Sequence, residues 1–585
     1  MKKQLIPIFY ACDERYAPCA AVSIASVFDN ASDENEYIVH VLNTDLTPDT
    51  EAALRALEEK NKRICFSDVR NLLYPFESLL PLRDRFSDAT YFRLFIAEMF
   101  PEYDKAIYLD ADTVVTSDVA ELYATDLGDA LVGACREAVM CEVPELGEYS
   151  ESVLGIDRRL YFNPGVMLIN CRGWRSRKVL DRFSRLVRFA RLTLTQDGGY
   201  LNLICKDHVK FLDREWNAQL GASSSDDSAN GAKILHFCMV EAKPWHNCGY
   251  TGADVFWKYA EKTAMHGRLR AVLENYTDGE RERDREACEH LKALAKEEIA
   301  SEDNYLRRLA ATRDPGRVAI VDKIAEFERD GRFFEDVEDD PPGRMLMPDE
   351  IDYLRRGFIQ KIKTRLAFGA ARKFLYSLLE EKKMIVKEIR GIENMRDLES
   401  GAVITCNHFN AFDSFAIQIV YEASEQRHRT FWRVIREGNY TSFPGFYGRL
   451  MRNCNTLPLS SNQKTMRKFV DGVGTHLRNG DFVLIYPEQS MWWNYRKPKP
   501  LRDGAYYFAS RNGVPVLPCF ITMRNSDIIG EDGFPVQEYT IHVGKPIYPD
   551  EQKAHRDNVR EMMDENARVW REIYEEEYGL PLSYS

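Results

Sequence analysis

The stretch Ala106-Ile107-Tyr108-Leu109-Asp110-Ala111-Asp112 decides how the first half of this chain is interpreted. Its four apolar residues predict a short buried strand, and two carboxylates follow directly. Residues two apart in an extended chain project to the same side, so Asp110 and Asp112 repel each other unless a cation lies between them. Oxygen ligands of this kind favour Mg²⁺ or Mn²⁺, and strand ends are where open α/β sheets bind ligands. The alternative is a pair of surface acids at a turn.

Short apolar strands alternate with amphipathic helices on both sides of this stretch. In the first 265 residues we expect strands at 5–10, 37–43, 106–109, 130–134 and 166–169, and helices at 20–29 and 50–59. This alternation predicts an α/β domain with a mostly parallel sheet. The same alternation returns over residues 384–585, with strands expected at 402–406, 482–486 and 516–521. It predicts a second α/β domain.

Size and composition limit the class of protein. A chain of 585 residues is too long for one hydrophobic core. Its net charge of -13 argues against a nucleic-acid partner. The 13 cysteines are an odd number without a close Cys-x-x-Cys pair, which favours reduced thiols in a cytosol. The apolar start contains Pro7 and ends at Asp13, so we expect a buried strand and not a signal peptide.

The middle of the chain has a different character. Residues 266–340 are rich in charge and predict a helical connector, which ends in an acidic, proline-bearing break at 335–343. Residues 341–383 follow, and within them 355–379 hold seven basic residues and no acid. Phe358, Ile362, Leu366 and Ala370 recur there at helical spacing. We expect an amphipathic helix on an anionic membrane, or else a helix docked on its own domain with solvated lysines.

Six segments, taken in order, resemble glycosyltransferase family 8. They are Tyr10-Ala11-Cys12-Asp13-Glu14-Arg15-Tyr16, Thr90-Tyr91-Phe92-Arg93-Leu94, Tyr108-Leu109-Asp110-Ala111-Asp112, Phe162-Asn163-Pro164-Gly165-Val166-Met167-Leu168-Ile169-Asn170, Asp197-Gly198-Gly199-Tyr200-Leu201-Asn202, and His236-Phe237 with Lys243-Pro244-Trp245. Taken singly, His236 is an ordinary core histidine, Asp197 a helix cap and Asn163-Pro164-Gly165 a turn. The resemblance covers residues 5 to about 257.

This resemblance implies a GT-A-type domain that transfers a sugar from a UDP-sugar to an acceptor hydroxyl with retention, using Mn²⁺ or Mg²⁺. It implies a metal site of Asp110, Asp112 and His236, and it places Asp197 beside the reacting carbon. Donor contacts are implied for Ala11, Asp13, Tyr16, Arg93, Asp110, Ala111, Asn163 and Lys243, the last at the diphosphate. Two features depart from the family pattern: Gly198 stands where glutamine is usual, and the interval from His236 to Lys243 is about one residue longer.

A second constellation lies at Val403-Ile404-Thr405-Cys406-Asn407-His408-Phe409-Asn410-Ala411-Phe412-Asp413. On one helix, a spacing of five residues sets two side chains roughly 140° apart. His408 and Asp413 therefore meet only if His408 lies in the turn before the helix. In that arrangement the carboxylate holds the imidazole tautomer while the other ring nitrogen takes a proton. Such a pair without an obvious serine nucleophile suits base catalysis on a substrate hydroxyl.

Residues 385 to about 550 resemble the glycerolipid acyltransferase family, of the lysophosphatidic acid type. After the His–Asp segment come Tyr486-Pro487-Glu488-Gln489-Ser490 and Val514-Pro515-Val516-Leu517-Pro518. The resemblance implies a catalytic His408, Asp413 and Glu488, an acyl-CoA or acyl-carrier-protein donor, and a lipid-like acceptor. Gln489 replaces a usual glycine and the usual arginine is displaced, which leaves Arg449, Arg452 and Arg496 as candidates for an acceptor phosphate. Met491, Trp492 and Trp493 offer apolar surface to acyl chains, or are core.

The sequence thus predicts a bifunctional transferase, with glycosyl transfer and acyl transfer in one envelope glycolipid or phospholipid pathway. We expect it in the cytoplasm and peripherally on the inner face of the cell membrane, because no run of 18 apolar residues occurs. Two alternatives stay open. In the first, only one domain is catalytically active and the other serves as a binding or targeting module. In the second, the chain is a membrane-bound scaffold without activity.

Overall fold

A computed structural model describes residues 3–76, 79–81, 88–221, 229–239, 242–338 and 343–584. The chain divides into two compact units, residues 1–311 and 312–585. Part of the predicted acidic break, residues 339–342, lies outside the described residues. Each unit contains its own seven-stranded sheet.

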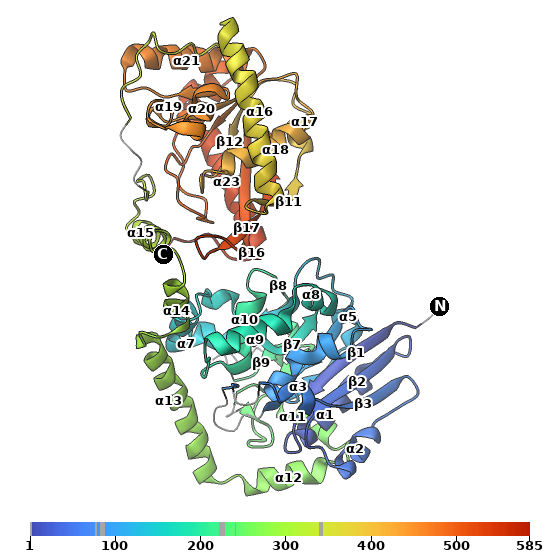
Figure 1. The fold of residues 1–585 in the computed structure, drawn as a ribbon. Coiled ribbons are helices and arrows are strands. Elements are labelled where there is room, and N and C mark those ends of the chain that lie inside the picture. The colour runs from blue at the N-terminus through green and yellow to red at the C-terminus, as the bar shows by residue number, and fades with distance from the viewer. Residues whose placement is uncertain are drawn as a thin grey trace. The chain divides into compact units, whose positions relative to one another are not determined.

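The sheet of the first unit is mostly parallel, as its alternating pattern predicts (Figure 1). In spatial order its strands are β3 (Lys62–Asp68), β2 (Glu36–Asn43), β1 (Leu5–Ala11), β4 (Ala106–Leu109), β7 (Phe162–Ile169), β6 (Val132–Arg136) and β8 (Val209–Phe211). Strand β7 runs antiparallel to both β4 and β6, while the remaining neighbours pair in parallel. The predicted strand at 106–109 is confirmed with both of its ends.

A second, three-stranded sheet carries the histidine of the predicted metal site. It consists of β5 (Thr113–Val115), β10 (Ile234–His236) and β9 (Ala218–Gln219), with β10 in the middle. The antiparallel pairing of β10 with β5 sets His236 opposite Thr113, the residue that follows Asp112. The fold thereby joins segments more than a hundred residues apart in sequence.

Helices cover both faces of the large sheet in the first unit. Helices α1 (Ala17–Asn30), α11 (Ala253–Ala260) and α12 (His266–Asn275) pack on the face that includes Ile6 and Ile8. Helices η1 (Asp88–Phe95), α4 (Ile96–Met99), α8 (Cys171–Ser176), α9 (Val179–Phe189) and α10 (Gln196–Cys205) pack on the other face. The connector is helical, with α13 (Asp278–Ala300) and α14 (Tyr305–Ala311) in this unit. The shorter elements are α2 (Pro48–Arg55), α3 (Arg70–Leu73), α5 (Val119–Tyr123), α6 (Ala138–Glu142), α7 (Pro144–Ser152), η2 (Arg158–Leu160) and η3 (Arg214–Trp216).

The sheet of the second unit is also mostly parallel. Its order is β11 (Ile385–Arg390), β17 (Pro535–Val543), β16 (Val516–Ile529), β12 (Ala402–Thr405), β15 (Phe482–Ile485), β13 (Phe431–Ile435) and β14 (Thr456–Pro458). Only β16 and β17 pair antiparallel among these strands. The predicted strand at 516–521 continues to Ile529, where it forms a long hairpin with β17.

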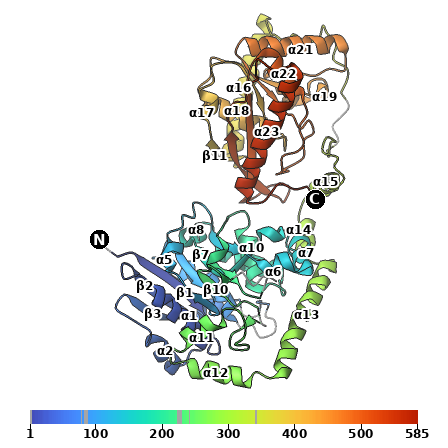
Figure 2. The same cartoon turned by 180° about the vertical axis from the view of Figure 1, so that it is seen from behind.

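Successive strand residues face opposite sides, so this sheet too has two buried faces. Ile404 and Leu484 face α16 (Phe358–Glu380) and α18 (Asp413–Ala423). Val403 and Val483 face α21 (Gln463–Arg478), α22 (Gly504–Asn512) and α23 (His555–Tyr578), of which α22 and α23 are in front in Figure 2. The remaining helices are α15 (Pro315–Arg329), α17 (Glu393–Arg396), α19 (Glu437–Thr441) and α20 (Gly445–Asn453). The α/β architecture predicted for both halves is confirmed.

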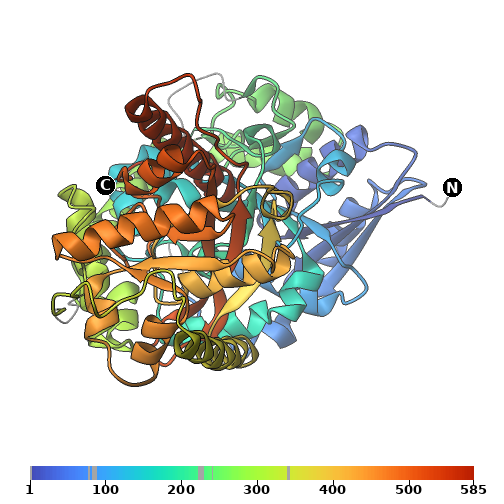
Figure 3. The ribbon, with the colours of Figure 1, turned by 90° about the horizontal axis from the view of Figure 1, so that it is seen from above.

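Helix α16 is the predicted basic amphipathic helix. Figure 3 looks nearly along it and shows it at the margin of the second unit. Its C-terminal half docks through Leu375 and Leu378, whereas Phe358 and Leu366 are 78% and 70% exposed. Arg355, which the sequence pattern groups with this basic surface, is instead buried and donates hydrogen bonds to the carbonyls of Arg452, Asn453 and Thr456. Within the part of the chain that the structure describes, no helix is both long and apolar enough to cross a bilayer.

Candidate active sites

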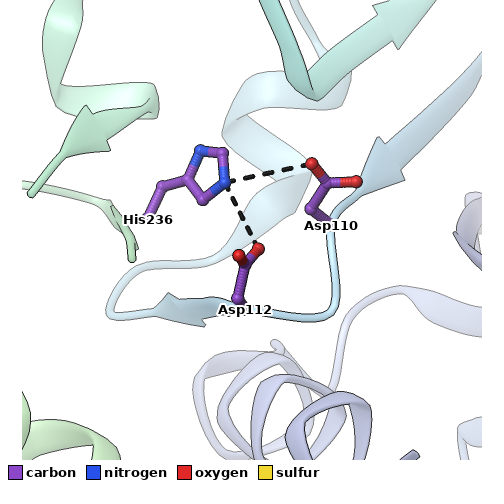
Figure 4. Close-up of side chains that lie close together, drawn as sticks. All are labelled: Asp110, Asp112 and His236. Carbon is purple, nitrogen blue, oxygen red and sulfur yellow. Dashed lines mark ion pairs between the residues drawn. The ribbon is translucent and has the colours of Figure 1, made fainter. Parts of the chain in front are cut away.

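The first site is a cluster of two carboxylates and one imidazole (Figure 4). His236 Nε2 lies 3.3 Å from Asp112 Oδ1 and 3.9 Å from Asp110 Oδ2. One ligand atom from each of the three residues can be chosen so that all lie within 4.8 Å of one another. Two carboxylate oxygens and one imidazole nitrogen form a donor set that suits Mn²⁺ or Mg²⁺. The residues present therefore fit the metal that the sequence predicts.

The chain around β7 makes room for this cluster. Asp110 N donates a 2.7 Å hydrogen bond to the carbonyl of Gly165, which fixes the carboxylate just beyond β4. A Cβ atom at Gly165 would lie 2.3 Å from His236 Cε1 and 2.6 Å from Asp110 Oδ2. Any side chain at this position would displace the imidazole or the carboxylate, so the glycine is a steric requirement of the site.

Two buried cations border the cluster. Arg93 Nη2 lies 2.9 Å from Asp110 Oδ1, and Arg93 Nε lies 3.2 Å from Asp197 Oδ2. Lys243 Nζ pairs with Asp112 Oδ2 at 2.5 Å. Burial alone would raise the pKa of Asp112, but the charge of Lys243 and the contact with His236 lower it below its ordinary value. Asp112 is therefore held ionised although it is buried, which is what metal ligation requires.

The predicted donor loop lies beside the lysine segment. Asp13 Oδ1 accepts a 2.9 Å hydrogen bond from Tyr16 N, and its other oxygen pairs with Arg15. The ring of Tyr16 stands edge-on to Trp245 with centroids 6.3 Å apart, and Trp245 follows Lys243 by two residues. Ala11 and Ala111 are buried. The structure thus brings the first loop and the late lysine segment to the same place.

Asp197 and Asn163 border the site on its other side. Asp197, in the first turn of α10, accepts a hydrogen bond from Thr90 Oγ1 and pairs with Arg93, so it is not a simple helix cap. Burial raises the pKa of Asp197, and Arg93 opposes that rise. Asn163 donates a 2.8 Å hydrogen bond to Glu137 Oε2. Glu137 was missed in the sequence because it lies in no motif, and its strand end is joined to Asn163 only through the pairing of β6 with β7.

The second site is a His–Asp pair at the end of β12. His408 lies in the turn before α18, and its Nδ1 is 2.6 Å from Asp413 Oδ2. Tyr486 OH donates a 2.7 Å hydrogen bond to Asp413 Oδ1, and its ring stacks on the imidazole at 4.2 Å. The side chain of His408 keeps 23% exposure, and Nε2 is the ring nitrogen that is not paired with Asp413. The carboxylate is held at both oxygens and can fix only one imidazole tautomer.

Glu488 supports the backbone of this pair. Its Oε2 accepts a 2.9 Å hydrogen bond from His408 N, and its Oε1 accepts one of 2.8 Å from Lys499 N. Burial raises the pKa of Glu488 and lowers that of Lys499, whose ammonium donates to the Ser490 carbonyl and hydroxyl. Glu488 thus holds the turn that carries the histidine. Sequence reasoning missed Lys499 because it lies beyond the motif, among prolines typical of a loop.

The arginines proposed for an acceptor phosphate are held in different parts of the domain. Arg452 donates to the carbonyls of Tyr440 and Phe443, next to α19. Arg496 donates to Asn525 and Gln537 on the β16–β17 hairpin, and Arg449 is exposed on α20. Trp492, considered as surface for acyl chains, is 0% exposed and packs against Phe333. Trp492 is therefore a core residue, which is the second of the two alternatives that the sequence left for it.

Two family models match this chain, each within a different unit. Residues 7–249 match the family model of glycosyl transferase family 8, and residues 387–522 match the acyltransferase model. A putative glycosyltransferase of Haemophilus influenzae is 28% identical over 221 residues, which are 37% of this chain and 63% of that protein. Lipopolysaccharide 1,2-glucosyltransferase of Escherichia coli is 27% identical over 44% of this chain and 78% of its own.

Solved structures give weaker similarities over parts of the chain. The galactosyltransferase LgtC, solved with donor and acceptor sugar analogues, is 27% identical over 44% of this chain and 96% of its own, with a TM-score of 0.38. The 1-acyl-sn-glycerophosphate acyltransferase PlsC of Thermotoga maritima is 17% identical over 37% of this chain and 79% of its own, with a TM-score of 0.25.

Both matched families are transferases. In particular, residues 7–249 match glycosyl transferase family 8 and residues 387–522 match the acyltransferase family, which is the fusion that the sequence motifs predict.

Proposed function

We propose that this protein is a bifunctional transferase, with a retaining sugar transfer from a UDP-sugar in its first unit and an acyl transfer to a lipid-like hydroxyl in its second. The observation that carries the proposal is the presence of two assembled polar constellations, Asp110–Asp112–His236 and His408–Asp413, each at the end of a central strand. We assign the first domain to residues 1–265 with a helical connector behind it. The acyltransferase domain proper is assigned to residues 384–585.

In the first unit, Asp110, Asp112 and His236 would hold Mn²⁺ or Mg²⁺. The ion would supply charge neutralisation for a diphosphate leaving group. Lys243, buried and next to Asp112, adds a second positive charge at the position that the departing phosphate requires. Arg93 holds Asp110 and Asp197 in place, while Asn163 and the loop at Asp13 and Tyr16 contribute donor contacts. The family resemblance implies that Asp197 would lie beside the reacting carbon of the sugar.

In the second unit, His408 acts as the general base. Asp413 accepts from Nδ1–H, so the lone pair of Nε2 is free to take the proton of the acceptor hydroxyl as that oxygen attacks the thioester carbonyl. The proton then passes to the leaving thiolate of acyl-CoA or of acyl-carrier protein. Tyr486 holds the carboxylate of Asp413, and Glu488 holds the backbone of His408, so the two side chains stay in contact. This mechanism needs no serine nucleophile.

The substrate class is proposed from the two matched families together and from the name of one relative. The Escherichia coli relative is named a lipopolysaccharide glucosyltransferase, and an acyltransferase on the same chain points to an envelope glycolipid or phospholipid. The exposed apolar face of α16 and its lysines support a peripheral position on the inner face of the cell membrane. Arg449, Arg452 and Arg496 do not form an evident phosphate cradle, so the acceptor group is left open.

The proposal is tested by two assays on the full chain. Asp110→Ala should lower Mn²⁺-dependent UDP release from UDP-sugars by at least about 100-fold and leave thiol release from acyl-CoA unchanged. His408→Ala should lower thiol release by about 10²–10⁴-fold and leave UDP release unchanged. Asp254→Ala and His428→Ala, which change exposed residues of the same types, are the controls.

Three other results would have different meanings. Loss of both activities in one variant indicates folding damage. One activity missing from the wild type supports the alternative in which one domain only binds or targets. Two missing activities would leave a scaffold without catalysis.

A further inference from the structure

A line of buried amides leads from the metal cluster to a carboxylate that no motif contains. His236 Nδ1 lies 2.9 Å from Asn217 Oδ1, Asn217 Nδ2 donates to Asn163 Oδ1 at 3.0 Å, and Asn163 Nδ2 donates to Glu137 Oε2 at 2.8 Å. Asn163, Asn217 and His236 are 5%, 0% and 2% exposed. We call these four residues the amide relay.

The backbone N–H of Gly165 fixes the direction of the hydrogen bonds in the amide relay. This group only donates, and it lies 2.9 Å from one side-chain atom of Asn163, which must therefore be the oxygen. The other side-chain atom of Asn163, which faces Glu137 Oε2, is then its NH₂ group.

That orientation passes along the relay to the histidine. Because Asn163 presents its oxygen, Asn217 must present its NH₂ group to Asn163 and its own oxygen to His236. Nδ1 of His236 must then carry the proton. In the neutral imidazole the proton-free nitrogen is then Nε2, which faces Asp110 and Asp112. Histidine ligands of metals depend on such partners, and loss of one costs about 10–100-fold in metal affinity.

We propose that Asn217 is a positioning residue of the metal site, and that with Glu137 and Asn163 it holds His236 in the tautomer that can bind a divalent cation. The proposal rests on the function proposed above. It adds a link between the residue expected at the donor sugar, Asn163, and the metal ligand, because both share Asn217. Sugar-side and metal-side contacts are thus oriented by one network.

The test is a titration of the purified full chain with Mn²⁺ alone, followed by calorimetry or by the electron paramagnetic resonance signal of free Mn²⁺. Asn217→Leu keeps a side chain of similar size but removes the acceptor for Nδ1–H, and it should weaken Mn²⁺ binding by about 10–100-fold. Asn217→Asp restores an acceptor for Nδ1–H but loses the donor to Asn163, so it should bind Mn²⁺ more tightly than Asn217→Leu. A purely structural role predicts that Asp, a buried charge, binds no better than Leu.

Gln219→Met is the matched control. Gln219 is a similarly buried amide two residues further along the chain, on β9, but it accepts from Ala138 N and donates to the Arg136 carbonyl. It should leave Mn²⁺ binding unchanged, and comparable loss in this control would overturn the proposal. Unchanged binding in Asn217→Leu would also overturn it, while leaving the proposed glycosyl transfer intact. If the wild type binds no Mn²⁺, or if Asp110→Ala binds it equally well, the metal assignment and this inference both fail.

Discussion

Gly165 is the residue on which the geometry of the metal cluster depends most directly. Its missing Cβ lets His236 and Asp110 approach, since an added methyl would lie 2.3 Å and 2.6 Å from atoms of those residues. We expect Gly165→Ala to weaken Mn²⁺ binding by at least about 100-fold and to destabilise the first unit by about 1–3 kcal/mol. Calorimetric titration and thermal unfolding measure the two effects.

Gly198→Ala is the control for this substitution. The nearest atom to an added Cβ there is Tyr161 OH at 3.5 Å, an ordinary contact. Mn²⁺ affinity should stay within about threefold of the wild type. Equal losses in the two variants would show that the steric argument at Gly165 is wrong.

A second residue-scale prediction concerns pH. Burial, reinforced by the neighbouring Glu297, raises the pKa of Glu298 from 4.5 to about 7. The folded state therefore holds this proton more tightly than the unfolded state. The contribution of Glu298 to the free energy of unfolding is fully present below pH 4.5 and is lost as the pH rises through about 7.

Glu298→Gln should remove this pH dependence. The side chain of Glu298 is partly solvent-accessible, so solvent screening reduces the effect to about 1–2 kcal/mol. At pH 8 the variant should unfold at a higher temperature than the wild type, and at pH 4.5 the two should be alike. Glu297→Gln, which changes the exposed neighbour, should keep most of the dependence. If the unfolding temperature of the wild type changes from pH 5 to 8 no more than that of Glu298→Gln, the assignment is wrong.

At the scale of single elements, α16 is divided into a docked half and an exposed half. Ile362 and Leu366, 46% and 70% exposed, lie one turn apart on the exposed stripe. Exposed apolar side chains flanked by lysines bind anionic bilayers by burial and charge together. The double change Ile362→Glu and Leu366→Glu should weaken binding to vesicles with anionic lipid by at least about 10-fold, as measured by co-sedimentation.

The control for α16 is Val321→Glu on α15. Val321 is 39% exposed, so the change adds one negative charge, half of that in the double variant, to another exposed apolar residue of the second unit. Vesicle binding should be unaffected. If the control weakens binding as much, or if the wild type does not bind these vesicles, α16 is not a membrane-contact helix.

On the scale of the whole molecule, the two units have separate cores. Trp174 belongs to the core of the first unit, and Trp492 packs in the second with Phe327 and Phe333 from the segment around α15. Each is almost fully buried, so truncation to alanine should cost about 3–5 kcal/mol.

We expect two unfolding transitions in a calorimetric scan. Trp174→Ala should lower only one of them and Trp492→Ala only the other, because distant sites without shared partners act additively. A single transition that both substitutions lower equally would mean that the units unfold together. The same experiment shows whether residues 312–338, which pack beside Trp492, belong energetically to the acyltransferase unit.

The sequence by itself determined those features that depend on neighbours along the chain. The apolar run before Asp110 predicted β4 with both of its ends, and the five-residue spacing of His408 and Asp413 required a histidine in the turn before a helix, where it lies. Strand periodicity, helix periodicity and motif spacing are local properties, because they follow from backbone geometry over a few residues.

Only the tertiary structure decided which distant side chains share an environment. The pairing of β10 with β5 brings His236 to the carboxylates, and the β6–β7 pair brings the motif-free Glu137 to Asn163. The tertiary structure also decided that Trp492 and Arg355 are buried. The residue type and the sequence neighbours of each are equally compatible with a position on the surface. Strand register and packing between remote segments are set by the whole core, since the free energy of one contact depends on all the others that form with it.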